Sequence, residues 1–174
     1  MKQLAYGMLL FIACMTTFAA TDKNVLKPKI TLNHLKTIEA KELNGDELYF
    51  DITEMRANEP GKFYRIPEHP IHWSSSQLTK LKKVKLWSEE IQPGKIVILL
   101  FSLMEEDDTP FNPDDMIGVV RVELKNKDGV LSVHWTIPNR AVGPVTIKGE
   151  KGDIQKFSLN SEDGSYEVFL SLEK

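Results

Sequence analysis

Cysteine is nearly absent from this chain: the single one, Cys14, lies in an apolar segment near the N-terminus. One thiol cannot close a disulfide within the chain, so the fold has to be stable without such a link. The apolar run near the N-terminus, residues 4–15, is shorter than the roughly 20 residues that a permanent membrane helix needs. Positive charge is not in excess, since the formal net charge is −3 at pH 7. A nucleic-acid partner is therefore not expected, because phosphate binding needs clustered cations.

The N-terminus has the pattern of a secretory signal peptide. Lys2 supplies a charged start, and residues 4–15 form an apolar run without charge, followed by small residues that include Ala19 and Ala20. The pattern predicts cleavage after Ala19 or Ala20, with Ala19 preferred, and thus a bacterial protein that is exported to the periplasm or secreted. A second interpretation makes Cys14 the lipid-modified first residue of a lipoprotein.

With residues 1–19 as signal peptide, residues 20–174 remain, without an internal repeat or a low-complexity linker. About 155 residues are enough for one core, because a domain of this size buries roughly two thirds of the surface of its unfolded chain. A single domain is expected, with no transmembrane segment in the mature chain.

Apolar and polar residues alternate along much of the chain from Ile30 onward, which is typical of β-strands with one buried face. The alternation is clearest at 117–124, where Val120, Val122 and Leu124 are expected to face a core. The nearly continuous apolar run at 96–103 instead favours a central strand that is buried on both faces. Further strands are expected at 30–38, 48–54, 63–66, 83–87, 153–159 and 166–172.

Turn-forming pairs such as Asn44–Gly45 and Asp128–Gly129 separate these segments. Residues 74–81 fit one helical turn, and 130–147 fit an insertion or an extra hairpin. Short strands with this punctuation predict an all-β fold, an eight-stranded antiparallel β-sandwich.

The segment between the strands expected at 96–103 and 117–124 is rich in carboxylates. Pro110 and Pro113 keep it from continuing either strand. Carboxylates in one loop repel one another unless solvent or a cation screens them. Ca²⁺ suits this role because it takes 6–8 oxygen ligands at about 2.4 Å, and the alternative is a solvated acidic loop that binds no metal. The carboxylates are Glu105, Glu106, Asp107, Asp108, Asp114 and Asp115.

This segment resembles the third calcium-binding loop of C2 domains. In that family a strand ends in an Asp-x-Asp pair, and the chain returns to the next strand through Asn/Asp-Asp-x-Ile-Gly. Glu105 and Asp107 match the pair, with Asp108 as an alternative to Asp107, and residues 114–118 match the return. A glutamate thus stands where the family usually has an aspartate.

An earlier segment, residues 44–49, is similar to the first-loop signature of the same family, Gly-x-Ser-Asp-Pro-Tyr-Val. Asp46 takes the place of the aspartate, and Glu47 with the residue after it replaces the proline. The nearest residue for a second first-loop aspartate is Glu42. The resemblance spans roughly residues 30–172.

The resemblance implies a divergent, exported C2-like member that is a binding module and not an enzyme. Its implied activity is calcium-assisted contact with phospholipid headgroups or with a protein partner, with Ca²⁺ as cofactor. Two alternatives stay open: a metal-independent structural or protein-interaction protein of the envelope or secretome, and a hydrolase that uses two of the carboxylates. The implied metal ligands are Asp46, Glu47, Glu105, Asp107, Asp108, Asp114 and Asp115.

A lysine-rich segment lies at 80–85. It resembles the lysine-rich strand with which C2 domains bind phosphoinositides, which makes it a candidate for lipid contact. The other interpretation is an edge strand whose lysines prevent pairing with other chains. That interpretation is preferred, because each lysine adds only about 1 kcal/mol near an anionic membrane. The lysines are Lys80, Lys82, Lys83 and Lys85.

Histidine and catalytic motifs give little support for other chemistry. His69 and His72 are three residues apart, but Pro70 favours an extended chain in which the two side chains lie on opposite faces, so zinc is not expected. A Gly-x-Ser-x-Gly motif, a His/Cys pair and a phosphate-binding glycine loop are all absent from the sequence. An enzyme is therefore not expected.

The three tryptophans, Trp73, Trp87 and Trp135, are expected to pack in the core or at its rim. An exposed tryptophan would suit contact with a membrane or a glycan.

Overall fold

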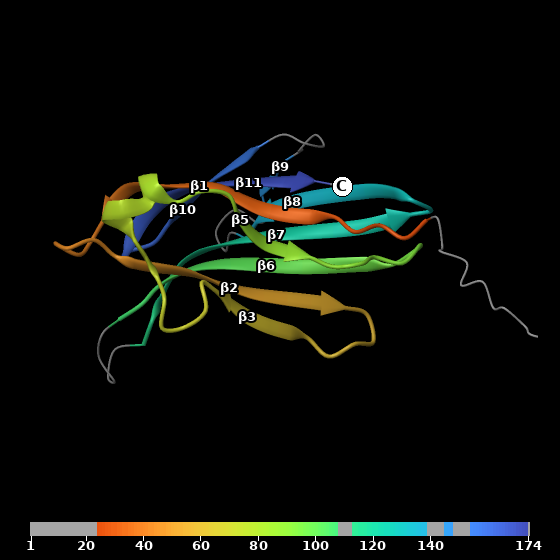
Figure 1. Cartoon of the computed structure of the whole chain (residues 1–174), viewed down its shortest axis with the longest axis horizontal. Coiled ribbons are helices and arrows are strands. Elements are labelled where there is room, and N and C mark those ends of the chain that lie inside the picture. Colours follow the sequence, from red (N-terminus) through yellow and green to blue (C-terminus); the bar gives the residue numbers. More distant parts are fainter. Residues whose placement is uncertain (1–23, 108–112, 139–144, 148–153, 174) are drawn as a thin grey trace, which may run out of the picture.

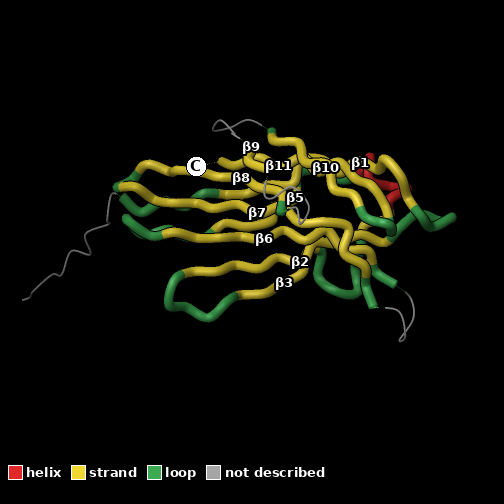
Figure 2. The backbone as a smooth tube through the Cα atoms, turned by 180° about the vertical axis from the view of Figure 1, so that it is seen from behind, coloured by secondary structure: helices red, strands yellow, loops and turns green. Residues whose placement is uncertain are grey.

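Two antiparallel β-sheets pack face to face in the computed structural model, which describes residues 24–107, 113–138, 145–147 and 154–173 (Figures 1 and 2). The all-β antiparallel sandwich expected from the sequence is confirmed. Within the described residues, no helix is long and apolar enough to cross a membrane. The expected signal peptide, residues 1–19, lies outside the described residues.

The smaller sheet has the strand order β10-β11-β1-β5. Its strands are β1 (Lys29–Ala40), β5 (Val84–Ser88), β10 (Gln155–Asn160) and β11 (Gly164–Glu173). The larger sheet has the order β3-β2-β6-β7-β8-β9, with β4 paired to β2. Its strands are β2 (Glu47–Arg56), β3 (Lys62–Ile66), β4 (Trp73–Ser74), β6 (Ile96–Glu105), β7 (Asp115–Lys127), β8 (Val130–Ile137) and β9 (Val145–Ile147). A 3-10 helix, η1 (Ser75–Lys80), confirms the expected helical turn.

The core lies between the sheets because each strand turns its apolar face inward. Val120, Val122 and Leu124 of β7 are buried, as their alternation predicts. The prediction for 96–103 is wrong in one respect: burial alternates along β6, so only one face of this central strand is in the core. Residues of its outer face such as Leu100 are half-buried beside strands β2 and β7. Apolar residue type alone did not reveal which face was covered.

The segment 130–147 contributes a hairpin and not an insertion outside the sheet. β8 pairs with β7 over seven residue pairs, and β9 pairs with β8. Trp135 on β8 is buried, and its ring centroid lies 5.4 Å from that of Phe157 on β10. This contact joins the two sheets. The described residues form eleven strands, whereas eight were expected.

Candidate functional site

The β1–β2 turn and the β10–β11 turn lie at one end of the sandwich, on the left of Figure 1, where β6 also ends and β7 begins. We call this end the turn end. The antiparallel register places Glu105, the last residue of β6, opposite Asp115, the first residue of β7. The backbone N–H of Glu106 donates to the carbonyl of Glu47, 2.8 Å away, which ties the β6–β7 turn to the start of β2. Residues far apart in the sequence therefore share one surface.

Asp46 organises the β1–β2 turn and is fully buried. One of its carboxylate oxygens, Oδ1, accepts the backbone N–H groups of Lys41 and Glu42, each at 3.0 Å. The other, Oδ2, accepts a hydrogen bond from the hydroxyl of Tyr166 on β11. Burial and then this bond raise the pKa of Tyr166, which keeps the phenol protonated as a donor. We therefore assign Asp46, expected as a metal ligand, to holding the turn.

Glu42, Glu105 and Asp107 form the acidic cluster, with one carboxylate oxygen from each lying within 4.8 Å of the others. Glu42 comes from the β1–β2 turn that Asp46 holds, whereas Glu105 and Asp107 come from the end of β6 and the residues after it. Glu105 is only 5% exposed, and its Oε1 has no hydrogen-bond partner in the described part of the chain. The same is true of Oδ2 of Asp107. An unpartnered buried carboxylate is costly, so this arrangement needs a compensating cation or proton.

The electrostatics of the acidic cluster agree with that requirement. Burial, followed by the negative charges of Asp107, Glu42 and Asp46, raises the pKa of Glu105 to about 8. Partial burial and the carboxylates Asp163, Asp107 and Asp114 likewise hold the pKa of Asp115 above its ordinary value. The turn end thus carries a concentrated negative field.

The geometry of the acidic cluster fits a hard cation. Ca²⁺ binds oxygen at about 2.4 Å, so two ligands of one ion are at most about 4.8 Å apart. The three carboxylate oxygens satisfy that limit. An all-oxygen donor set suits Ca²⁺, Mg²⁺ or Mn²⁺ better than a soft metal. Backbone carbonyls and water would have to complete the 6–8 ligands that Ca²⁺ takes.

Two of the other expected metal ligands, Glu47 and Asp114, have partners of their own. Glu47 faces His72, with 3.2 Å between Oε1 and Nε2. Asp114 accepts the hydroxyl of Tyr49 at 2.5 Å and the backbone N–H of Asp107 at 3.3 Å, so it supports the turn. Asp108 lies outside the described residues, and Asp115 contributes its charge.

Glu106 turns away from the acidic cluster. Its carboxylate forms an ion pair with Arg65, whose guanidinium lies 3.6 Å from the ring centroid of Tyr49. Two histidines also approach Glu106: Nε2 of His69 and Nδ1 of His72 each lie 3.7 Å from one of its carboxylate oxygens. The expectation that the two histidines lie on opposite faces is wrong, because the chain bends between them. The N–H of Ile71 donates to the carbonyl of Glu68 and closes this turn.

The lysines of 80–85 do not lie on one strand. Lys80 ends η1, Lys82 and Lys83 lie in the connection that follows, and only Lys85 lies on β5. All are exposed, and β5 is an edge strand of the smaller sheet. This position supports a protective role against edge pairing. Lys83 also adds to the positive field around Glu173.

Two residues at the turn end were not picked out from the sequence. Asp163 lies in the β10–β11 turn, and its negative charge helps to raise the pKa of both Lys41 and Asp115. Tyr166 is part of the alternating pattern of the last strand, which predicts its burial but not its bond to Asp46. Pairings over such sequence separations leave no local pattern.

No family model and no curated protein matches the chain. Among solved structures, it is similar to a C2 domain of plant extended synaptotagmin 1, with 15% identity, a TM-score of 0.35, and coverage of 84% of this chain and 93% of that one. It is also similar to human GIVD cytosolic phospholipase A2, with 10% identity and a TM-score of 0.35, over 84% of this chain and 32% of that one. Likeness at this level says nothing about the ligands or partners of this chain.

Proposed function

We propose that the protein is an exported, non-enzymatic binding module whose acidic cluster takes up Ca²⁺ and whose turn end then docks on an anionic phospholipid surface. The observation that carries the proposal is the carboxylate of Glu105, which is 5% exposed and has an oxygen without a partner among the described residues. It lies where Glu42 and Asp107 bring two more carboxylates within the reach of one ion.

Two exposed apolar side chains, next in sequence to acidic residues of the turn end, support a membrane surface as the partner. Leu43, the neighbour of Glu42 in the β1–β2 turn, is fully exposed. Met116, next to Asp115 at the start of β7, is about half exposed. Without a cation, the carboxylates repel anionic headgroups. A bound Ca²⁺ would remove that repulsion and let these side chains enter the headgroup region, whose anionic lipids attract positive charge.

A hydrolase is less consistent with this geometry. Glycosidase carboxylates lie roughly 5–9 Å apart across a substrate cleft, whereas the oxygens of the acidic cluster converge within 4.8 Å. Glu105, the residue with the raised pKa, is too buried to touch a substrate. A metal-independent interaction protein is the alternative, and in it a proton on Glu105 would take the place of the cation, as its raised pKa of about 8 allows.

Thermal unfolding of the protein in EDTA and in 1 mM CaCl₂ tests the metal site. A Kd of about 0.1 mM would stabilise the fold by about 1.4 kcal/mol and raise Tm by a few degrees. The shift is expected to vanish in Asp107→Asn and Glu105→Gln. It should persist in Asp128→Asn and Glu59→Gln, which make the same chemical changes at the opposite end of the sandwich. No shift in the unmodified protein would contradict the proposal.

Co-sedimentation with vesicles tests the docking step. Vesicles of phosphatidylserine and phosphatidylcholine are expected to bind the protein in Ca²⁺ and release it in EDTA. Leu43→Ser should weaken this binding while leaving the calcium shift in Tm intact. If Lys82→Gln/Lys83→Gln/Lys85→Gln abolishes binding while Leu43→Ser leaves it unchanged, the lysine segment and not the turn end is the docking surface.

A further inference from the structure

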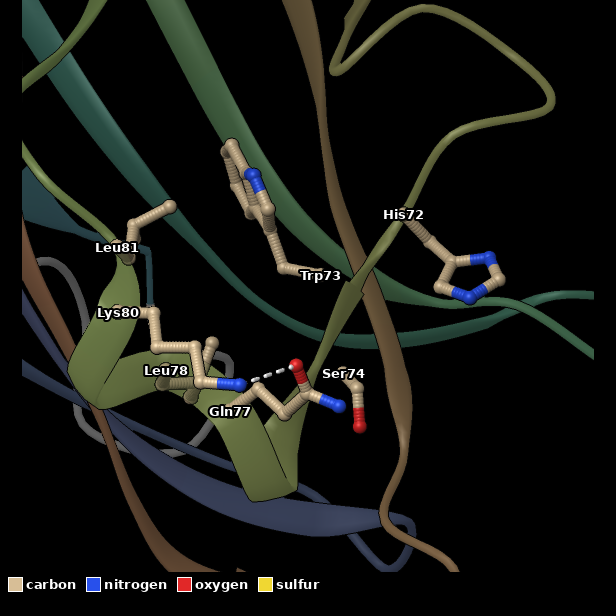
Figure 3. Close-up of a pocket in the computed structure, with 7 residues that line it drawn as sticks. All are labelled: His72, Trp73, Ser74, Gln77, Leu78, Lys80 and Leu81. Atoms are coloured by element: carbon tan, nitrogen blue, oxygen red, sulfur yellow. Dashed lines mark hydrogen bonds between the residues drawn. The ribbon is translucent and has the colours of Figure 1, made fainter.

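Trp73 differs from the other tryptophans of the chain. Trp87 and Trp135 are buried at 2% exposure, whereas Trp73 on β4 is only half-buried. Its ring and that of Phe50 form a T-shaped pair, with the centroids 6.2 Å apart. The rest of the ring borders a surface pocket beside η1 (Figure 3).

This pocket has an apolar and a polar side. Its volume is about 240 Å³. Drug-sized ligands occupy pockets of about 300–1,000 Å³, so this one has room for a single ring with its substituents. Trp73, Leu78 and Leu81 supply the apolar lining, and His72, Ser74, Gln77 and Lys80 supply the polar lining.

The polar side offers hydrogen-bond donors. The ammonium group of Lys80 donates to the side-chain oxygen of Gln77 at 3.1 Å, as Figure 3 shows. Both side chains are exposed, so the amide nitrogen of Gln77 and the other N–H bonds of Lys80 can meet a ligand. Donors of this kind select a ligand that is rich in acceptors, and the charge of Lys80 favours an anionic one.

We propose that this pocket binds an acidic sugar residue, a pyranose ring that carries a carboxylate. The C–H face of such a ring packs on an aromatic ring such as that of Trp73. Its carboxylate would accept from Lys80, and its hydroxyls would exchange hydrogen bonds with Gln77 and Ser74. A planar aromatic acid would use the apolar walls and Lys80 but would leave the other polar groups unused.

The pocket is separate from the acidic cluster. Its lining comes from β4, η1 and the residues that flank them, whereas the acidic cluster comes from the β1–β2 and β6–β7 turns. The two sites can therefore be tested independently, and failure of one would leave the other standing.

Titration with D-glucuronate tests the proposal, with tryptophan emission as the readout and EDTA present so that Ca²⁺ does not bridge the sugar to the acidic cluster. A saturable change is expected, with D-glucose binding at least about tenfold more weakly because it lacks the charge-assisted bond to Lys80. Benzoate, which keeps a ring and a carboxylate but no hydroxyls, should also bind more weakly.

Lys80 and Lys127 are exposed, so their substitution keeps this part of the test free of folding defects. Lys80→Gln should weaken glucuronate binding by about tenfold, while Lys127→Gln at the far end of β7 should not change it. In Trp73→Phe the emission change should disappear, and calorimetry should show weaker binding. No saturation with glucuronate up to about 50 mM, where a ligand of millimolar Kd saturates, would overturn the proposal. So would equal binding of glucose or benzoate.

Discussion

The hydroxyl of Tyr166 donates a hydrogen bond to the carboxylate of Asp46 across 120 residues of sequence. This bond fixes the β1–β2 turn to β11, and the turn in turn carries Glu42 into the acidic cluster. The resemblance to C2 domains implies that Asp46 is a metal ligand, whereas its hydrogen bonds indicate that it anchors the turn. The two roles predict different results for the same substitutions.

Asp46→Ala is expected to lower the free energy of unfolding by about 3 kcal/mol, because it leaves the N–H groups of Lys41 and Glu42 and the Tyr166 hydroxyl without an acceptor. Asp46→Asn should cost less, since the amide oxygen can still accept the two N–H groups. Urea denaturation measures both. If Asp46 anchors the turn, Asp46→Asn retains the calcium-induced rise in Tm, and loss of that rise without loss of stability would make Asp46 a ligand.

The raised pKa of Glu105 predicts an unusual pH dependence in EDTA. Its ordinary value is 4.5 and its folded value is about 8, so the folded state holds the proton more tightly. The apo protein is then most stable below pH 4.5 with respect to this group, and loses stability on the order of 4 kcal/mol as the pH rises to 8. Glu105→Gln should remove this loss and make the apo protein more stable at pH 8.

Calcium provides the complementary measurement for Glu105. At pH 8, Ca²⁺ should stabilise the unmodified protein more than at pH 6, where the ion competes with a proton for the carboxylate. Unfolding curves at both pH values, with Glu59→Gln as the control, measure the difference. A Tm shift that is the same at both pH values would show that Glu105 is not a ligand.

The sequence predicted the sandwich, the position of most strands and the acidic turn, because alternation and turn residues are local signals. It also suggested Glu105 and Asp107, through a spacing that belongs to one turn. It did not separate the anchoring role of Asp46 from a ligand role, because that distinction depends on Tyr166. The contact of His69 and His72 with one carboxylate was likewise missed, since it depends on a turn and a partner outside the segment.

Glu54 is a second buried carboxylate, and its pKa is lowered whereas that of Glu105 is raised. It is 2% exposed on β2 and accepts the indole N–H of Trp87 on β5 at 2.8 Å, which joins the two sheets. Arg56 donates to its other oxygen at 2.6 Å, and Lys62 lies 3.6 Å away. Burial raises the pKa of Glu54, but the hydrogen bonds from Trp87 and Arg56 and the charges of Arg56 and Lys62 outweigh it and hold the pKa below 4.5.

A lowered pKa makes the stabilisation by Glu54 fully present above pH 4.5 and lost as the pH falls through the folded value. Glu54→Gln is expected to cost about 3 kcal/mol at pH 7, because it removes the carboxylate with which the largely buried guanidinium of Arg56 is paired. The cost should shrink below pH 4, where the unmodified residue also becomes neutral. Denaturation from pH 7 to pH 2 measures it, and a cost that does not change with pH would contradict the role of the charge.

Gly118 on β7 lies where the two sheets approach closely. A methyl group added there would meet Cβ of Leu159 on β10 at 3.1 Å and its Cδ2 at 3.2 Å. Gly118→Ala is therefore expected to destabilise the fold by about 1–3 kcal/mol, as overpacking of a core does. The glycine of the Ile117-Gly118 return thus has a packing role that does not depend on metal.

A double-mutant cycle distinguishes this packing role from an effect on the backbone. Leu159→Ala alone should cost about 2–5 kcal/mol through the cavity that it leaves. The double variant Gly118→Ala/Leu159→Ala should cost less than the sum, because the added methyl group then enters the vacated space. Strict additivity would show that the cost of Gly118→Ala does not come from Leu159. Since neither side chain belongs to the acidic cluster, the calcium-induced rise in Tm should survive in all three variants, which separates the stability of the sandwich from its ion binding.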